Sequence, residues 1–298
     1  MTINIKDILE KIPSAKFIGD EKATINKLIQ LDSHNNNPHA LFWCNDKNID
    51  QLKHITNGTV ICSEKIQEIG LNKNCNYIIV AEPKRAFQQI MQHFFYNNTR
   101  IAFISPSSNI NATVKFGKNV FIGHNVVIEE NCVIGNDTSI GHNTVIMRDT
   151  QIGNNCVIGS NNTIGGIGFG YVKNENGQYE VVPHIGNVVI NNHVEIGNNT
   201  CIDRAVIGST ILHENVKVDN QVHIAHGVIV GENTLIIANS IIGGSAIIGK
   251  NVWIAPNACI INKGVVKDNA IVGMGAVVIK PVEENTTVIG NPAKKLVK

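Results

Sequence analysis

The residues best suited to chemistry lie in one short segment, Val218 to His226. Asp219 and Ala225 each directly follow a residue that the repeat described below directs inward, and His226 comes one place later. This spacing predicts that Asp219 and His226 meet near a single corner of the fold. A carboxylate beside an imidazole fixes its tautomer and raises its basicity, as a general base for a nucleophilic amine requires. The alternative is an exposed ion pair at a corner, and geometry alone does not choose between them.

The elements that must position these residues follow a period of six. An aliphatic or aromatic residue returns at every sixth position from Phe116 to Ile164, from Ile190 to Ile202 and from Leu212 to Val278. Neither a helix nor an alternating strand has this period, whereas a β-solenoid does, because each flat face of a coil takes about six residues. Gly and Asn often follow the repeated residue, and both tolerate the backbone conformations of tight corners. We therefore expect a mainly β chain that contains a parallel β-helix.

The chain divides into three parts by this criterion. Residues 1–104 lack the period; Gly58–Cys62 predicts a buried strand and Pro83–Phe95 a helix, so a small α/β domain is expected. Residues 105–280 are assigned to the β-helix, and 281–298 to a C-terminal extension.

Two breaks interrupt the sixfold count. The first is a loop at 165–188, which is rich in Gly and aromatic residues, and the second contains Asp203 and Arg204. A long loop in a regular rod is either a flap over a substrate cleft or a neutral insertion, and we favour the flap. Phe169 and Tyr171 are then expected to contact substrate.

Composition limits the classes of partner. Across 298 residues, Lys plus Arg (25) nearly balances Asp plus Glu (24), so neither nucleic acid nor a membrane surface is an expected partner. The seven cysteines include no Cys-x-x-Cys pair, and Cys132 and Cys156 occupy inward or corner positions, which favours buried free thiols. Without a signal-like start or a long apolar run, we expect a soluble cytoplasmic protein with no membrane insertion.

The motifs Gly168-Phe169-Gly170-Tyr171, Ile202-Asp203-Arg204 and Asp219 to His226 resemble those of the UDP-3-O-acylglucosamine N-acyltransferases, in the hexapeptide-repeat acyltransferase superfamily. This resemblance implies a left-handed β-helix and a homotrimer with active sites between neighbouring prisms. It also implies that His226 is the general base, that Asp219 supports it and that the backbone N–H of Gly244 is the oxyanion donor.

The resemblance implies a uridine site in the N-terminal domain, where the family has Phe, Asn and Tyr at three-residue intervals. This chain has Phe42 and Asn45 at that spacing but Asn48 in place of the Tyr. Stacking of uracil is therefore half supported, and a Phe in such a domain is more often part of the core. Asn220 and His223 complete the expected substrate contacts.

Two departures concern the acyl donor. The family has a second histidine near Lys263, and it continues into a C-terminal helix associated with acyl carrier protein, whereas this sequence ends at Lys298. The ending from Gly273 to Lys295 instead resembles coenzyme A-dependent sugar acetyltransferases. The residues expected to bind the donor are Lys263, Gly275, Asn291, Pro292 and Lys294.

We therefore predict an acyltransferase that moves an acyl group from a thioester, with acyl-CoA favoured, to the amino group of a nucleotide-linked amino sugar for surface polysaccharide or lipopolysaccharide synthesis. The alternative is UDP-3-O-(3-hydroxyacyl)glucosamine N-acyltransferase of lipid A synthesis, which uses acyl-ACP. No permanently bound cofactor or metal is expected. A zinc hydratase would need three converging imidazoles, and a scaffold would not need an interrupted repeat. The sugar, the choice between UDP and dTDP, and the acyl length are open.

Overall fold

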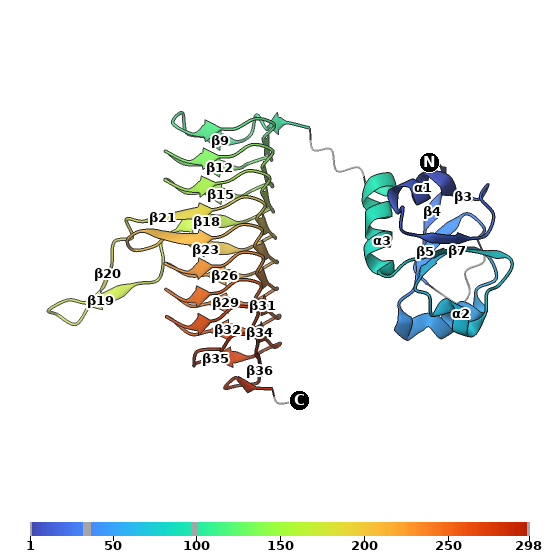
Figure 1. Ribbon diagram of the computed structural model, residues 1–298. Helices are drawn as coiled ribbons and strands as arrows, with labels where there is room; N and C mark the ends of the chain where they lie inside the picture. Colours follow the sequence, from blue (N-terminus) through green and yellow to red (C-terminus); the bar gives the residue numbers. More distant parts are fainter. Residues whose placement is uncertain (1, 32–36, 97–100, 297–298) are drawn as a thin grey trace. The chain divides into compact units, whose positions relative to one another are not determined.

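The computed structural model of the chain describes residues 2–31, 37–96 and 101–296. It separates into two compact units, Met1–Thr99 and Arg100–Lys298, which are described in turn (Figure 1).

The first unit is built on a five-stranded sheet in the order β2-β7-β6-β5-β4. Its strands are β2 (Lys16–Ile18), β4 (Lys27–Leu28), β5 (Ala40–Trp43), β6 (Gly58–Cys62) and β7 (Cys75–Ile79), and only β2 runs antiparallel to its neighbour. A small separate pair joins β1 (Ile3–Asn4) to β3 (Thr24–Ile25). The helices are α1 (Ile5–Lys11), the 3₁₀ helix η1 (Asp46–His54), α2 (Ile66–Ile69), α3 (Pro83–Ile90) and the π-helical turn η2 (Met91–Phe95).

Both faces of this sheet are covered. Leu41, Ile61 and Ile78 pack in one apolar cluster, together with residues of α1 and α3. Their chain neighbours Phe42 and Tyr77 pack in a second cluster on the other face. Alternate side chains of a strand point to opposite faces, so a central strand buried on both faces is apolar throughout.

The second unit is a triangular coil of three parallel sheets. The first sheet contains β8 (Phe103–Ile104), β11 (Phe121–Ile122), β14 (Ser139–Ile140), β17 (Val157–Ile158), β22 (Glu195–Ile196), β25 (Lys217–Val218), β28 (Leu235–Ile236), β31 (Trp253–Ile254), β34 (Ile271–Val272) and β36 (Thr287–Ile289), with β37 (Lys294–Lys295) antiparallel at its end. The second sheet contains β9 (Asn109–Ile110), β12 (Val127–Ile128), β15 (Val145–Ile146), β18 (Thr163–Gly166), β23 (Cys201–Asp203), β26 (His223–Ile224), β29 (Ile241–Ile242), β32 (Cys259–Ile260) and β35 (Val277–Val278). The third contains β10 (Lys115–Phe116), β13 (Val133–Ile134), β16 (Gln151–Ile152), β21 (Asn187–Ile190), β24 (Ser209–Leu212), β27 (Ile229–Val230), β30 (Ile247–Ile248) and β33 (Val265–Val266).

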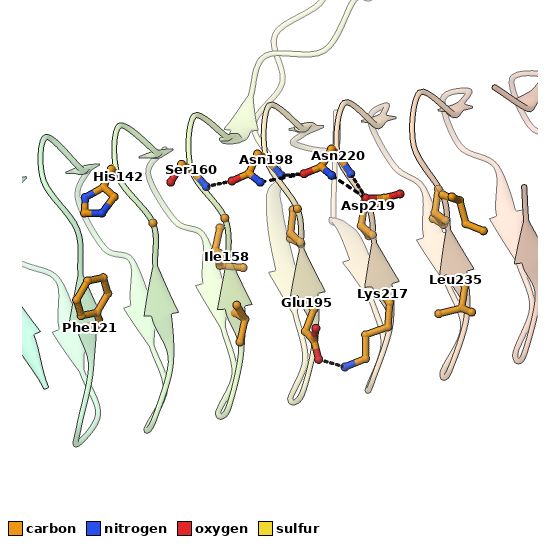
Figure 2. Close-up of a pocket in the computed structure, with 18 residues that line it drawn as sticks. Phe121, His142, Ile158, Ser160, Glu195, Asn198, Lys217, Asp219, Asn220 and Leu235 are labelled. Carbon is orange, nitrogen blue, oxygen red and sulfur yellow. Dashed lines mark hydrogen bonds and ion pairs between the residues drawn. The ribbon is translucent and has the colours of Figure 1, made fainter. Parts of the chain in front are cut away.

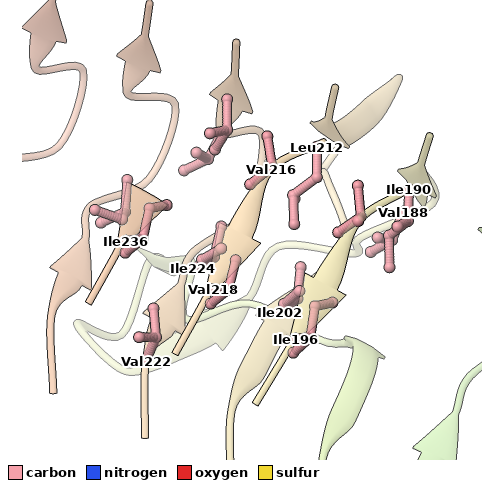
Figure 3. Close-up of a cluster of buried hydrophobic side chains, with 14 of the residues drawn as sticks. Val188, Ile190, Ile196, Ile202, Leu212, Val216, Val218, Val222, Ile224 and Ile236 are labelled. Carbon is pink, nitrogen blue, oxygen red and sulfur yellow. The ribbon is translucent and has the colours of Figure 1, made fainter. Parts of the chain in front are cut away.

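The predicted repeat residues form the core of this unit. Ile196, Ile202 and Leu212 occupy successive sheets of one coil, and each is at most 2% exposed (Figure 3). Each stacks on the equivalent residue of the next coil, as Ile202 does on Ile224. The fold is thus a left-handed parallel β-helix preceded by a small α/β unit, and the fold-class prediction is confirmed.

The Gly and Asn residues of the repeat have different roles at the corners. Asn takes the left-handed backbone conformation, as at Asn125 (φ 56°) and Asn143 (φ 57°). Gly135 has no such φ, but a Cβ on it would lie 2.5 Å from the backbone of Gly153 in the next coil. Close stacking of coils, and not unusual φ, therefore requires these Gly residues.

Stacking continues past residue 280. Val282 forms a bridge with Val266, and β36 pairs with β34. The expected C-terminal extension thus begins as further coil, and its last two residues lie outside the described part of the chain. Cys132 and Cys156 are buried free thiols, as expected. Of the helices in the described ranges, none is long and apolar enough to cross a bilayer.

Candidate active site

His226 lies at the corner between the second and third sheets, which we call the second corner. It follows β26, and three polar residues lie in its neighbourhood: Asp203 at the end of β23, His184 from the long insertion, and His223 in β26, which pairs with Asp203. We call these four residues the His226 cluster. Corners repeat once per coil, so Gly244 occupies the equivalent position in the next coil.

Packing fixes the ring of His226. A Cβ on Gly244 would lie 2.7 Å from Nε2, and a Cβ on Gly168 would lie 2.9 Å from the Cβ of His226. The ring of His184 meets it at an interplanar angle of 79°, with 5.4 Å between the ring centroids. Among the described residues, no hydrogen bond engages either ring nitrogen of His226, so both are free to meet a substrate.

The electrostatics of the cluster favour a neutral His226. Burial lowers the pKa of His226, His184 lowers it further, and Asp203 opposes the shift. Burial also raises the pKa of Asp203, against the opposing effects of His223, His226 and His184. The Asp203 carboxylate is 3.6 Å from Nε2 of His223. A half-buried imidazole with a lowered pKa near a carboxylate suits a general base.

The prediction that Asp219 and His226 meet at one corner is wrong for a single chain. Asp219 follows β25 and lies at the corner between the first and second sheets, the first corner, whereas His226 follows β26. Residues seven apart are separated by one complete face, because a face takes six residues. Asp203, and not Asp219, is the carboxylate whose charge raises the pKa of His226.

Asp219 instead belongs to a shallow groove of about 720 Å³ on the first sheet (Figure 2). Its Oδ1 accepts hydrogen bonds from the backbone N (2.7 Å) and Nδ2 (2.9 Å) of Asn220, and its Oδ2 accepts one from the N of Ala238 (3.2 Å). An ion pair joins Lys217 to Glu195 at 2.8 Å on the same surface. Asn220 is therefore paired with Asp219 and lies away from the second corner.

The backbone N–H of Gly244, the expected oxyanion donor, has an acceptor within the chain. It donates to Oδ1 of Asn262 at 3.0 Å. Gly244 does lie against the His226 ring as the stacking of corners requires. Use of this N–H by a substrate oxygen therefore requires that the Asn262 side chain give up the bond.

The insertion at 165–188 leaves the second corner and forms a hairpin of β19 (Tyr171–Lys173) and β20 (Tyr179–Val181), which extends away from the coil (Figure 1). Phe169 is 87% exposed, and its ring centroid is 4.9 Å from that of Tyr171. Both predicted aromatic residues thus lie at the surface near Gly168.

Arg204 anchors both ends of this insertion. It is 2% exposed, and its Nε donates to the carbonyl of Gly165 at 2.8 Å, Nη1 to that of Gly186 at 3.4 Å and Nη2 to that of Arg148 at 2.7 Å. Arg204, which lies in the second break of the repeat, therefore holds both ends of the insertion that forms the first break.

The N-terminal prediction fails in part. Phe42 is 1% exposed and packs inside the second apolar cluster of its unit, so it offers no face to a base. The side chain of Asn45 caps η1 by accepting a hydrogen bond from the N of Asn48 at 3.0 Å. These two residues are structural in this conformation.

The predicted donor-binding residues are dispersed. Lys263 lies at the second corner, one coil beyond Gly244, and its N donates to the Gly244 carbonyl at 2.7 Å. Gly275 lies at the first corner, between β34 and β35. Pro292 and Lys294 line a separate groove of about 380 Å³ at the C-terminal end, after Asn291. Only Lys263 shares the corner of His226.

Sequence reasoning missed two members of the site. Asp203 was noted at the second break but given no role, and His184 was not singled out. Both lie in or beside the interruptions of the repeat, which is the signal that points to them. In residues 2–31, 37–96 and 101–296, no three His, Cys, Asp or Glu side chains form a group able to hold a metal ion.

Comparisons with known proteins agree with this architecture. The family pattern described as "Bacterial transferase hexapeptide (six repeats)" matches residues 113–147 and 131–166. The UDP-3-O-acylglucosamine N-acyltransferase of Christiangramia forsetii is 38% identical over 250 residues, covering 78% of this chain and 73% of that relative. The enzyme of the same name from Fusobacterium nucleatum is 42% identical over 252 residues, covering 80% and 74%.

Solved structures support the fold. The UDP-N-acetylglucosamine acyltransferase of Campylobacter jejuni is 20% identical, with a TM-score of 0.59 over 64% of this chain and 73% of that one. Another, from Bacteroides fragilis, is 26% identical, with a TM-score of 0.59 over 65% and 74%. At such identities the likeness establishes the β-helix, whereas the curated relatives bear on chemistry.

Proposed function

Because this chain belongs to the UDP-3-O-acylglucosamine N-acyltransferase family, we propose that it transfers an acyl group from a thioester to the amino group of a UDP-3-O-acylglucosamine. That it is an acyltransferase follows from the family. The acceptor named here is the alternative of the sequence analysis, and the curated relatives support it over the preferred coenzyme A-dependent sugar N-acyltransferase.

The observation that best supports this activity is the state of His226: it is half-buried, its pKa is lowered, and neither ring nitrogen has a hydrogen bond among the described residues. The amine nitrogen attacks the thioester carbonyl carbon, and His226 accepts the proton that the amine loses. Collapse of the tetrahedral intermediate breaks the C–S bond, and the imidazolium returns the proton to the departing thiolate. Atoms and charge balance without a metal or a redox cofactor.

Two neighbours assist this step. Asp203 stabilises the imidazolium, because its carboxylate raises the pKa of His226. Gly244 is the oxyanion donor in the proposed mechanism, once its bond to Asn262 is released. Asp219 and Asn220 line the groove on the first sheet. Its charged and amide side chains could hydrogen-bond the hydroxyl groups of a nucleotide sugar, so this groove is the proposed place for part of the acceptor.

We propose further that the protein acts as a homotrimer. The insertion and the corner beside it expose large apolar side chains, with Phe169 at 87% and Ile207 at 80%. Exposed apolar patches of this kind mark interaction surfaces. Sedimentation equilibrium at micromolar concentration tests this, and a monomer contradicts it.

The carrier of the acyl group is not named by the relatives. The expectation of acyl-CoA therefore remains a prediction, and the alternative is acyl-ACP. Comparison of kcat/KM for the two thioesters of one acyl chain decides between them.

The activity is tested by incubating the full chain with UDP-3-O-acylglucosamine and a 3-hydroxyacyl thioester. We expect stoichiometric thiol release and an amide product, identified by mass spectrometry. An ester formed on UDP-N-acetylglucosamine, with no amide from the amino sugar, would contradict the proposal and indicate O-acylation instead.

A further inference from the structure

We propose that His184 is a positioning residue for the acyl transfer: its ring, anchored through Nδ1, packs edge-to-face against the ring of His226 and holds it in place. This inference rests on the proposed function, in which His226 is the base. It concerns a residue of the insertion, more than forty positions from His226 in the chain.

The tautomer of His184 follows from its single hydrogen bond. Its Nδ1 lies 2.7 Å from the carbonyl oxygen of Val182. A carbonyl oxygen only accepts, so Nδ1 carries the proton and Nε2 of the neutral ring is an acceptor with a free lone pair.

That Nε2 is buried without a partner. His184 is 4% exposed, and within the described residues its Nε2 is the one buried side-chain nitrogen or oxygen with no hydrogen bond. An unpaired buried polar atom destabilises the folded state, because it has lost its hydrogen bonds to water. A residue that only filled this space would be apolar, so the nitrogen requires an explanation.

This nitrogen faces the space above Gly168, where the ring of His226 also lies. The position that a Cβ of Gly168 would take is 2.8 Å from His184 Nε2 and 3.0 Å from Cδ2 of His226. Both imidazoles therefore converge on the same side of Gly168, at the near-perpendicular angle that suits an edge-to-face pair. The absence of a side chain at Gly168 permits this contact.

The positioning role of His184 also explains how the insertion affects His226. Gly168 and His184 come from its two ends, and Arg204 ties both ends to the corner. The hairpin between them is exposed. The insertion thus fixes the base through two residues while its hairpin projects from the coil.

The test compares four variants of the full chain: His184→Ala, His184→Phe, His226→Ala and the double variant His184→Ala/His226→Ala. We expect His184→Ala to lower kcat by about tenfold to a hundredfold, the cost of a misplaced catalytic group, with little change in KM for the amino sugar. His184→Phe keeps a ring against His226 but lacks the Nδ1–H that anchors this ring to the Val182 carbonyl, so it should recover part of the lost kcat.

The double variant is decisive, because a residue that acts through His226 has no effect once His226 is absent. We expect the double variant to match His226→Ala within about twofold. A further drop in the double variant, an unchanged kcat in His184→Ala, or an effect on KM alone would overturn the inference. If His184→Ala does not fold, His184→Phe replaces it in the same comparison.

Failure of the proposed function gives a different result. In that case His226→Ala retains normal turnover, or no amide forms with the unaltered protein, whatever residue stands at position 184.

Discussion

Gly244 lies so close to His226 that a Cβ on it would stand 2.7 Å from the imidazole Nε2. Gly168 makes a comparable approach to Cβ and Cδ2 of the same side chain. The orientation of the candidate base is therefore set by two glycines and one imidazole, and not by a hydrogen-bonded carboxylate.

Substitution Gly244→Ala tests this packing. The added methyl group must displace the ring, so we expect kcat to fall by at least about tenfold, with a loss of stability of about 1–3 kcal/mol from overpacking. Steady-state kinetics and denaturant unfolding measure the two effects. The neighbouring Ser245→Ala is the control and should be near normal; equal kcat in Gly244→Ala and the unaltered protein would show that the ring can move without cost.

Substitution His226→Ala should reduce turnover by about a hundredfold or more, because a general base is lost. The coil should remain folded, since the side chain lies at a corner outside the inward core. His213→Ala, at another corner of the same unit, is the matched control for loss of an imidazole. Near-normal turnover in His226→Ala would mean that the base is elsewhere, with His223 the next candidate.

We expect the substitution Asp203→Asn to change the pH dependence of kcat/KM. Asp203 raises the pKa of His226, so Asp203→Asn should lower that pKa further. The acid limb of kcat/KM then moves to lower pH, because His226 stays deprotonated in more acidic solution, while the plateau falls because the base is weaker. Asp219→Asn lies at the other corner and should leave the limb in place. A shifted limb in Asp219→Asn alone would restore Asp219 as the partner of the base.

The same substitution should stabilise the fold. Burial raises the pKa of Asp203 above that of the unfolded chain, so the free energy of unfolding falls as pH rises from the usual carboxyl pKa through the raised one. Asn carries no charge, and Asp203→Asn should therefore have the higher Tm at neutral pH. The advantage should vanish below the usual carboxyl pKa. A Tm difference that is constant with pH would indicate a packing effect.

Removal of the Arg204 guanidinium should release the insertion. Arg204→Met fills a similar volume but leaves three backbone carbonyls without this donor, and an unpaired carbonyl that stays buried, as at Gly165, costs about 1–3 kcal/mol. We expect a lower Tm and faster proteolysis within 165–188. Arg148→Met, whose side chain is half exposed, is the control; equal protease sensitivity in both variants would argue against the anchor.

The period of the sequence was sufficient to predict the β-helix. The position of an inward residue such as Ile202 or Ile224 depends only on the local face of six residues, and coils stack because each presents the same face to the next. The same period places His226 at a corner, whereas its role as the base was predicted from the resemblance of its motif to the family.

Its partners could not be found in this way. A fixed period places Asp219 on a different corner, whereas Asp203 reaches His226 from the previous coil. His184 arrives through an insertion whose path follows no repeat and is fixed by the buried contacts of Arg204. In the N-terminal unit, Phe42 lies in a strand with both faces covered, and only the packed structure shows that its ring is buried. The sequence determined the regular coil because each of its contacts repeats locally, and the tertiary structure decided the site because its contacts join segments that no local rule relates.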